Sequence, residues 1–163
     1  MRDSGSEDAK YGDQARRGSV QSSLSRWVIQ MGNSPESTVR NFLAAFTDRN
    51  VDELVGFFSD DAVFIDGPRG LHRGKQAIRS EFEAELAKSF ESIKIDVNSL
   101  VVNGATVMME GVENYIIGGK PFFLETIGAF DINPDGLITR WRYSYDLKPL
   151  TEQLLAAGFH VPS

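Results

Sequence analysis

Asp66 is the side chain of this sequence best placed for acid-base chemistry. It closes the apolar run 62–65 and stands directly before the turn Gly67-Pro68. In a strand, alternate side chains point to the same face, so Asp66 shares its face with Phe64. Apolar surroundings raise the pKa of a carboxyl group and make it a better base. Asp66 is therefore a candidate general base, although an aspartate before Gly-Pro is equally suited to capping that turn.

Glu113 is the second candidate, and it lies on the longest predicted strand, 106–117. Alternation along this strand and along the strand predicted at 137–145 gathers apolar and aromatic side chains on one face of each. Those faces carry Met109 and Tyr115 beside Glu113, and Trp141, Tyr143 and Tyr145 on the other strand. A glutamate carried inward among phenols is either a core carboxyl hydrogen-bonded to a tyrosine or an acid that faces a pocket.

Two carboxyl groups in one apolar cavity acquire different pKa values, which yields one acid and one base. The predicted catalytic residues are Asp66, Glu113 and Tyr143, and the predicted substrate-binding residues are Phe64, Met109, Tyr115, Trp141 and Tyr145.

Other chemistries find little support in the sequence. The two histidines, His72 and His160, lie far apart with no carboxylate at metal-ligand spacing, and no phosphate loop or nucleophile elbow is present. We therefore expect no metal and no cofactor. We expect His72 on a loop at the mouth of the cavity and His160 at a frayed chain end.

The elements that must position these residues are three helices followed by strands. Pro35 after Ser34 starts a helix with apolar positions at helical spacing, Asn50 caps a second helix over 51–58, and Phe82 lies in the apolar stripe of a third. The predicted strands cover 62–66, 93–97, 106–117, 122–132 and 137–145, and a terminal helix follows. This order predicts an α+β fold, with the helices packed on one face of a curved, mostly antiparallel sheet around a cone-shaped pocket.

Composition limits the possible partners. The chain has 163 residues, no cysteine and a net charge of −6, which argues against nucleic acid and anionic membranes as partners. Residues 1–33 are polar and read as a disordered or loosely attached tail, so the expected domain is 34–163. There is no apolar run of membrane-spanning length and no secretory signal, so we expect a cytoplasmic protein with a small apolar substrate.

Three segments in this order, "SDDAVFIDGP", "RGLHRGKQAIR" and "GLITRWRYSYDL", resemble a known superfamily. It comprises nuclear transport factor 2, ketosteroid isomerase, the SnoaL-like polyketide cyclases and limonene-1,2-epoxide hydrolase. The stretch "MEGVENYIIGGKPFFLETIGAFDINPDGLITRWRYSYDL" is most similar to the limonene-epoxide hydrolase branch. The resemblance runs from about residue 34 to the C-terminus, implies a cone-shaped α+β barrel, and favours a homodimer formed through the open face of the sheet.

In the limonene-epoxide hydrolase branch, an Asp-Arg-Asp set protonates the epoxide and activates water. The arginine of that set falls here on Gly111, and the two aspartates fall on Glu113 and Tyr143. A tyrosine and an asparagine that hold the water fall on Phe64 and Asp66. Only Glu113 keeps its chemical type, so the family mechanism does not transfer unchanged.

In ketosteroid isomerase, the general base matches Asp66, whereas the two oxyanion donors fall on Phe42 and Gly128. The leading hypothesis is a cofactor-independent epoxide hydrolase-like or epoxide-opening enzyme for a terpenoid or polyketide substrate. Proton transfer alpha to a carbonyl, as in an isomerase or cyclase, is the first alternative. A binding or dimerisation module that has kept the cone and lost the chemistry is the second.

Overall fold

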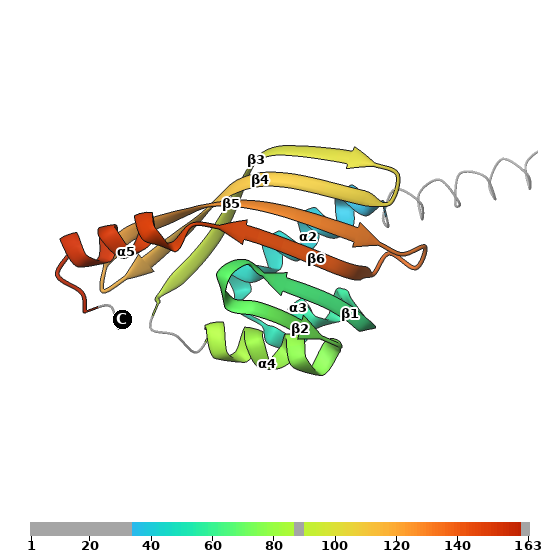
Figure 1. Ribbon diagram of the computed structural model, residues 1–163, viewed down its shortest axis with the longest axis horizontal. Coiled ribbons are helices and arrows are strands. Elements are labelled where there is room, and N and C mark those ends of the chain that lie inside the picture. Colours follow the sequence, from blue (N-terminus) through green and yellow to red (C-terminus); the bar gives the residue numbers. More distant parts are fainter. Residues whose placement is uncertain (1–33, 87–89, 161–163) are drawn as a thin grey trace, which may run out of the picture. The chain divides into compact units, whose positions relative to one another are not determined.

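A six-stranded curved sheet with helices on its inner side carries the site (Figure 1). The computed structural model describes residues 34–86 and 90–160. The residues from Pro35 onward form one compact unit. The tail predicted for residues 1–33 lies outside the described residues, so this domain boundary stays a prediction. The α+β arrangement of helices followed by strands is confirmed.

The helices follow the apolar spacing of the sequence. They are α2 (Pro35–Ala45), the short 3-10 helix η1 (Phe46–Asp48), α3 (Val51–Gly56), α4 (Lys75–Leu86) and α5 (Leu147–Ala156). As predicted, Asn50 caps α3, since its side-chain oxygen accepts the backbone N–H groups of Asp52 and Glu53. Asp146 caps α5 in the same way through the N–H of Lys148.

The strands are β1 (Phe58–Asp66), β2 (Gly70–Arg73), β3 (Ser92–Asn103), β4 (Thr106–Ile117), β5 (Lys120–Ile132) and β6 (Ile138–Tyr145). Their order in the sheet is β2-β1-β6-β5-β4-β3. All neighbours are antiparallel except β1 and β6, which run parallel. The parallel pair sets Asp66 opposite Tyr143, which brings the end of β1 beside the phenols of β6.

Several strands are longer than predicted, such as β1 and β3, and at two places the type of element differs. The second helix ends at Gly56 rather than continuing to Phe58, because Phe58 pairs with Ile138 and opens β1. A helix-compatible apolar spacing is thus overridden by strand pairing. The segment expected as a loop around His72 is strand β2, which forms a hairpin with β1 through the short 3-10 helix η2 (Gly67–Arg69).

The two faces of the sheet have different environments. The inner face is packed against α2, α3 and α4, where the ring of Phe42 lies edge-on to those of Phe58 and Trp141. Apolar side chains also remain exposed on β3, β4 and β5, namely Val101, Met108, Phe123 and Ile127. The homodimer stays a prediction, and these are the side chains that such pairing would cover. None of the helices in the described part of the chain has the length and apolar character needed to cross a bilayer.

Candidate active site

A cavity of about 680 Å³ opens among β1, β4, β6, α4 and α5. Most of its wall is apolar, and it includes both predicted carboxylates. Side chains that line it include Phe46, Phe64, Phe82, Phe90, Leu124, Trp141, Leu150, Leu154 and Phe159. A cavity of this size and character suits a small, largely apolar molecule.

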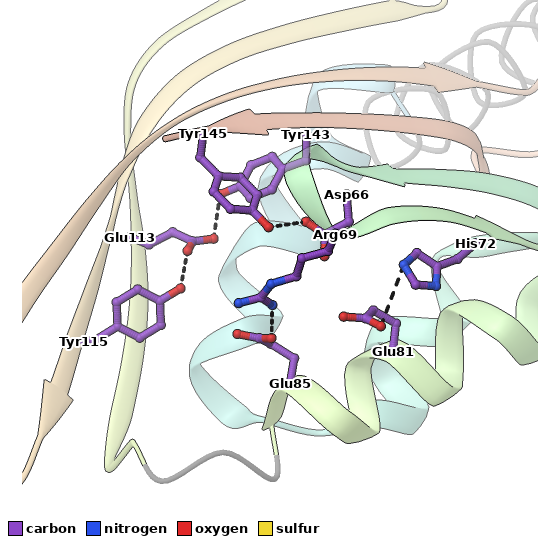
Figure 2. A network of polar contacts seen from close by, with 9 residues as sticks. All are labelled: Asp66, Arg69, His72, Glu81, Glu85, Glu113, Tyr115, Tyr143 and Tyr145. Carbon is purple, nitrogen blue, oxygen red and sulfur yellow. Dashed lines mark hydrogen bonds and ion pairs between the residues drawn. The ribbon is translucent and has the colours of Figure 1, made fainter. Parts of the chain in front are cut away.

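Asp66 ends β1 and is buried, with 5% of its surface exposed. Its Oδ1 accepts a hydrogen bond of 2.5 Å from the hydroxyl of Tyr145 (Figure 2). The turn helix η2 starts directly after Asp66, yet the Asp66 side chain makes no capping hydrogen bond to it. The turn-cap alternative is therefore wrong, and the carboxylate belongs to the cavity wall.

Glu113 projects inward from β4 and receives two phenol hydroxyls (Figure 2). Tyr143 donates to Oε1 at 2.5 Å, and Tyr115 donates to Oε2. Burial raises the pKa of Glu113 above its usual range, and the hydrogen bonds from the two tyrosines only partly oppose this shift. Glu113 thus has the hydrogen-bonded partners of a core carboxyl and also lines the cavity.

The phenols keep their protons. Burial, followed by the proximity of Glu113, raises the pKa values of Tyr115 and Tyr143 far above the ordinary range of a phenol. Burial and the hydrogen bond to Asp66 also raise the pKa of Tyr145. At neutral pH these three hydroxyls therefore act as hydrogen-bond donors and not as bases.

Arg69 and Glu85 form an ion pair at the cavity that sequence reasoning missed (Figure 2). Arg69 comes from η2, three residues after Asp66, and Glu85 from α4. Burial lowers the pKa of the Arg69 guanidinium, but Glu85, Tyr145 and Asp66 together raise it above its ordinary value. Although Gly111 leaves β4 without an arginine, a positive charge still lies near Asp66. The sequence signal was the "DGPR" turn, which returns the chain to the same strand end.

His72 and Glu81 join Asp66 in a second polar group (Figure 2). One ligand atom of each residue lies within 4.8 Å of the others, a grouping that could hold a metal ion. His72 is on β2 and not on a loop, and its ring stacks on Phe64 at a centroid distance of 5.6 Å. The spacing of these residues in the sequence gave no sign of the group, because the β1–β2 hairpin and α4 bring them together.

The predicted substrate-binding residues divide into two groups. Phe64, Tyr115, Trp141 and Tyr145 line the cavity, and the rings of Phe64 and Trp141 stack at 4.2 Å. Met109 is buried but is not among the lining residues. His160, expected at a frayed chain end, lines the cavity.

Met109 and the backbone of β3 explain why position 111 carries no side chain. A Cβ added at Gly111 would lie 2.6 Å from the carbonyl oxygen of Asp96 and 2.7 Å from Cε of Met109. Backbone at that distance cannot give way without moving β3. The arginine of the limonene-epoxide hydrolase branch therefore has no room at this point of the sheet.

Solved structures with similar folds include two epoxide-related enzymes. An LEH-like epoxide hydrolase from M. tuberculosis is 24% identical, covers 73% of this chain and 87% of its own, and has a TM-score of 0.62. SalBIII, an epoxide hydrolase/cyclase-like enzyme of pyran ring formation in salinomycin, is 16% identical over 71% of this chain and 92% of its own, with a TM-score of 0.62.

A third similar structure is a protein with a ketosteroid isomerase-like fold from Catenulispora acidiphila, in complex with trimethylamine. It is 22% identical, covers 77% of this chain and 97% of its own, and has a TM-score of 0.65. These similarities show the shared fold. The family model of the SnoaL-like domain matches residues 39–141, from α2 into β6 and across the strands that hold both carboxylates. The chain belongs to the SnoaL-like domain family.

Proposed function

We propose that this protein is an epoxide hydrolase-like or epoxide-opening enzyme for an apolar substrate of terpenoid or polyketide size. The observation that carries the proposal is the presence of two carboxyl groups in different environments on one cavity. Glu113 is buried among phenols with a raised pKa, whereas Asp66 lies close to the charged Arg69. Such a difference assigns the acid role to Glu113 and the base role to Asp66.

Epoxide opening needs a proton on the leaving oxygen and a base for the nucleophile. Asp66 takes a proton from water or from a hydroxyl group of the substrate. Glu113 gives its proton to the epoxide oxygen. Both residues extend from strands of one sheet, so their separation is fixed by backbone pairing.

Tyr143 holds the epoxide oxygen in this proposal, and proton counting supports the role. A protonated Glu113 carries a single O–H and can accept fewer hydrogen bonds than a carboxylate. Two phenols donate to it in the structure. When Glu113 carries a proton, the phenol beside the protonated oxygen can turn its own O–H to a substrate oxygen, and the O–H of Glu113 can then point to that same oxygen.

The apolar wall supports the same function. Aromatic and leucine side chains make most of the cavity wall apolar, and electrostatic interactions with the polar groups are stronger beside such a wall than in bulk water. An apolar wall also limits competing reactions of an activated substrate. The SnoaL-like family and the epoxide hydrolase and cyclase among its structural neighbours are consistent with this chemistry.

Proton transfer alpha to a carbonyl is the alternative reaction. The position of Asp66 at the end of β1, close to a guanidinium, favours it. Against it, the phenols of Tyr115, Tyr143 and Tyr145 all donate to carboxyl groups, so an enolate oxygen would have to displace one of them. Epoxide opening also requires Tyr143 to turn from Glu113 to the substrate, but it uses both carboxyl groups, one as acid and one as base.

A substrate panel tests the assignment. Terpene and fatty epoxides are incubated with the protein in oxygen-18 water, beside a β,γ-unsaturated ketone. We expect either a diol carrying the isotope or an internally opened product. Ketone isomerisation without epoxide opening would show that the protein is an isomerase and would contradict the proposal. Tight binding of apolar ligands without turnover of any compound would favour the binding module.

A further inference from the structure

We propose that Asp66, His72 and Glu81 together hold the water molecule that opens the epoxide. This inference rests on the proposed function and adds His72 and Glu81 as catalytic residues. Glu81 lines the cavity from α4, and His72 lies on β2, which is four strands away from the Glu113 strand β4 in the order of the sheet. The residues that hold the water would therefore be separate from the proton donor Glu113.

The distances allow one water to reach all three residues. The three polar atoms all lie within 4.8 Å of one another. Any three atoms this close share a point no more than about 2.8 Å from each of them, which is the length of a hydrogen bond. A water near that point would be within hydrogen-bond distance of one polar atom of each residue.

His72 supplies an independent observation. Its Nε2 is buried and has no hydrogen-bond partner among the described residues. It lies 3.7 Å from Oε2 of Glu81, which is too long for a direct hydrogen bond and suits a bridge through water. Because stacking against Phe64 holds the ring, this nitrogen has a defined direction. A buried polar nitrogen of this kind is ordinarily satisfied by an ordered water.

The donors and acceptors match those of one water molecule. Its two O–H groups point to the carboxylates of Asp66 and Glu81, and the N–H of His72 points to its oxygen. One lone pair of the water then remains for the substrate. Two acceptors and one donor therefore orient the nucleophile, as well as holding it in place.

The reaction step balances within these residues. The free lone pair of the water forms the new C–O bond while the epoxide C–O bond breaks. The electron pair of the broken bond goes to the epoxide oxygen, which takes the proton of Glu113. The water gives one proton to Asp66, which lines the cavity at the end of β1. The product is a diol, and proton exchange with solvent restores both carboxyl groups.

A crystal structure of the full chain tests the water site without any substrate. We expect density for one water within hydrogen-bond distance of Asp66, His72 and Glu81. An ion with an anomalous signal and contacts of about 2.0–2.2 Å would overturn the proposal and identify a metal site instead. A well-resolved map with no density at this point would overturn it as well.

Kinetics with an epoxide from the panel test the role in catalysis. Glu81→Gln and His72→Gln are expected to lower kcat for diol formation by about 10²-fold or more, with little change in the Kd of an inert apolar ligand. Glu83→Gln is the matched control, because Glu83 lies on the same helix with its side chain 55% exposed. Equal kcat values for wild type, Glu81→Gln and His72→Gln would overturn the proposal.

The outcomes also separate this inference from the proposed function. If wild type forms no diol from any epoxide, both the hydrolytic function and the role of this water fail. If wild type forms diol and the two variants match it, only the water site fails. A loss of ligand binding in the variants, parallel to the loss of turnover, would assign His72 and Glu81 to structure and overturn their catalytic role.

Discussion

Tyr143 and Tyr145 stand two residues apart on β6 and donate their hydroxyl groups to two different acids. Tyr143 binds Glu113 and Tyr145 binds Asp66, while the two rings lie 5.5 Å apart. One strand thus contacts both carboxyl groups of the cavity. The separation of the two acids depends on the pairing of β6 with β1 on one side, and with β5 and through it β4 on the other.

Asp66→Asn is expected to leave the fold intact and to lower turnover by about 10²–10⁴-fold, because an amide cannot take the proton. The amide oxygen still accepts the hydroxyl of Tyr145, so the melting temperature should change little. Kinetics on the best epoxide of the panel, with thermal melting of the same samples, provide the measurement. Full activity at unchanged stability would remove Asp66 from the mechanism.

Glu113 is expected to ionise above the ordinary glutamate pKa of about 4.3, because burial disfavours its charged form. A carbon-13 titration of the side-chain carboxyl group measures this directly. A resonance that titrates at the ordinary glutamate value would exclude Glu113 as the general acid.

The same shift has a consequence for stability. A folded-state pKa above the unfolded value means that the contribution of neutral Glu113 is fully present below the unfolded pKa. This contribution is lost as the pH rises through the folded pKa. The free energy of unfolding of wild type should therefore fall over this interval, and Glu113→Gln should lack this part of the decline. Urea unfolding at a series of pH values compares the two proteins, and parallel curves would contradict the expectation.

Gly111→Ala is expected to destabilise the protein by about 1–3 kcal/mol, since the new Cβ would press on the backbone of Asp96. Gly56→Ala is the control. A Cβ at Gly56 meets nothing within 4 Å, so that variant should unfold close to wild type. Urea unfolding of both variants gives the comparison, and equal stabilities would show that β3 moves aside at little cost.

Removal of residues 1–33 is expected to leave folding and activity unchanged, because few apolar side chains in that stretch can dock on the domain. Thermal melting and turnover of the shortened chain check this. A fall of several degrees would show that the apolar residues around Trp27 contribute to the stability of the domain.

Elements with a strong local pattern were predictable from the sequence. The period-two alternation of β4 gave the observed bounds 106–117 and carried Glu113 inward. The aromatic face of β6 was likewise predicted, because burial on one side of a strand leaves a clear signature. The end of α3 was not, since the pairing of Phe58 with Ile138 is a long-range contact that no local pattern contains.

The sequence did not predict the roles of Arg69, Glu81 and Glu85, because these residues reach the site through long-range contacts. Arg69 lies in a turn, and Glu81 and Glu85 lie on a helix where charged residues are ordinary. Only the docking of α4 against β1 and β2 turns them toward Asp66. The resemblance to the limonene-epoxide hydrolase branch pointed to β4 for an arginine, whereas the structure supplies one from η2.

Helix α5 forms part of the cavity wall, yet none of its residues is fully buried. The Gln153 side chain hydrogen-bonds to the backbone N–H and C=O of Phe123. Leu150 and Leu154 line the cavity. A helix with so little buried surface has a low free energy of local opening, so its amide protons should exchange faster than those of the central strands. A molecule bound against these leucines would add contacts to α5, and slower exchange confined to this helix would report cavity occupancy before any reaction is known.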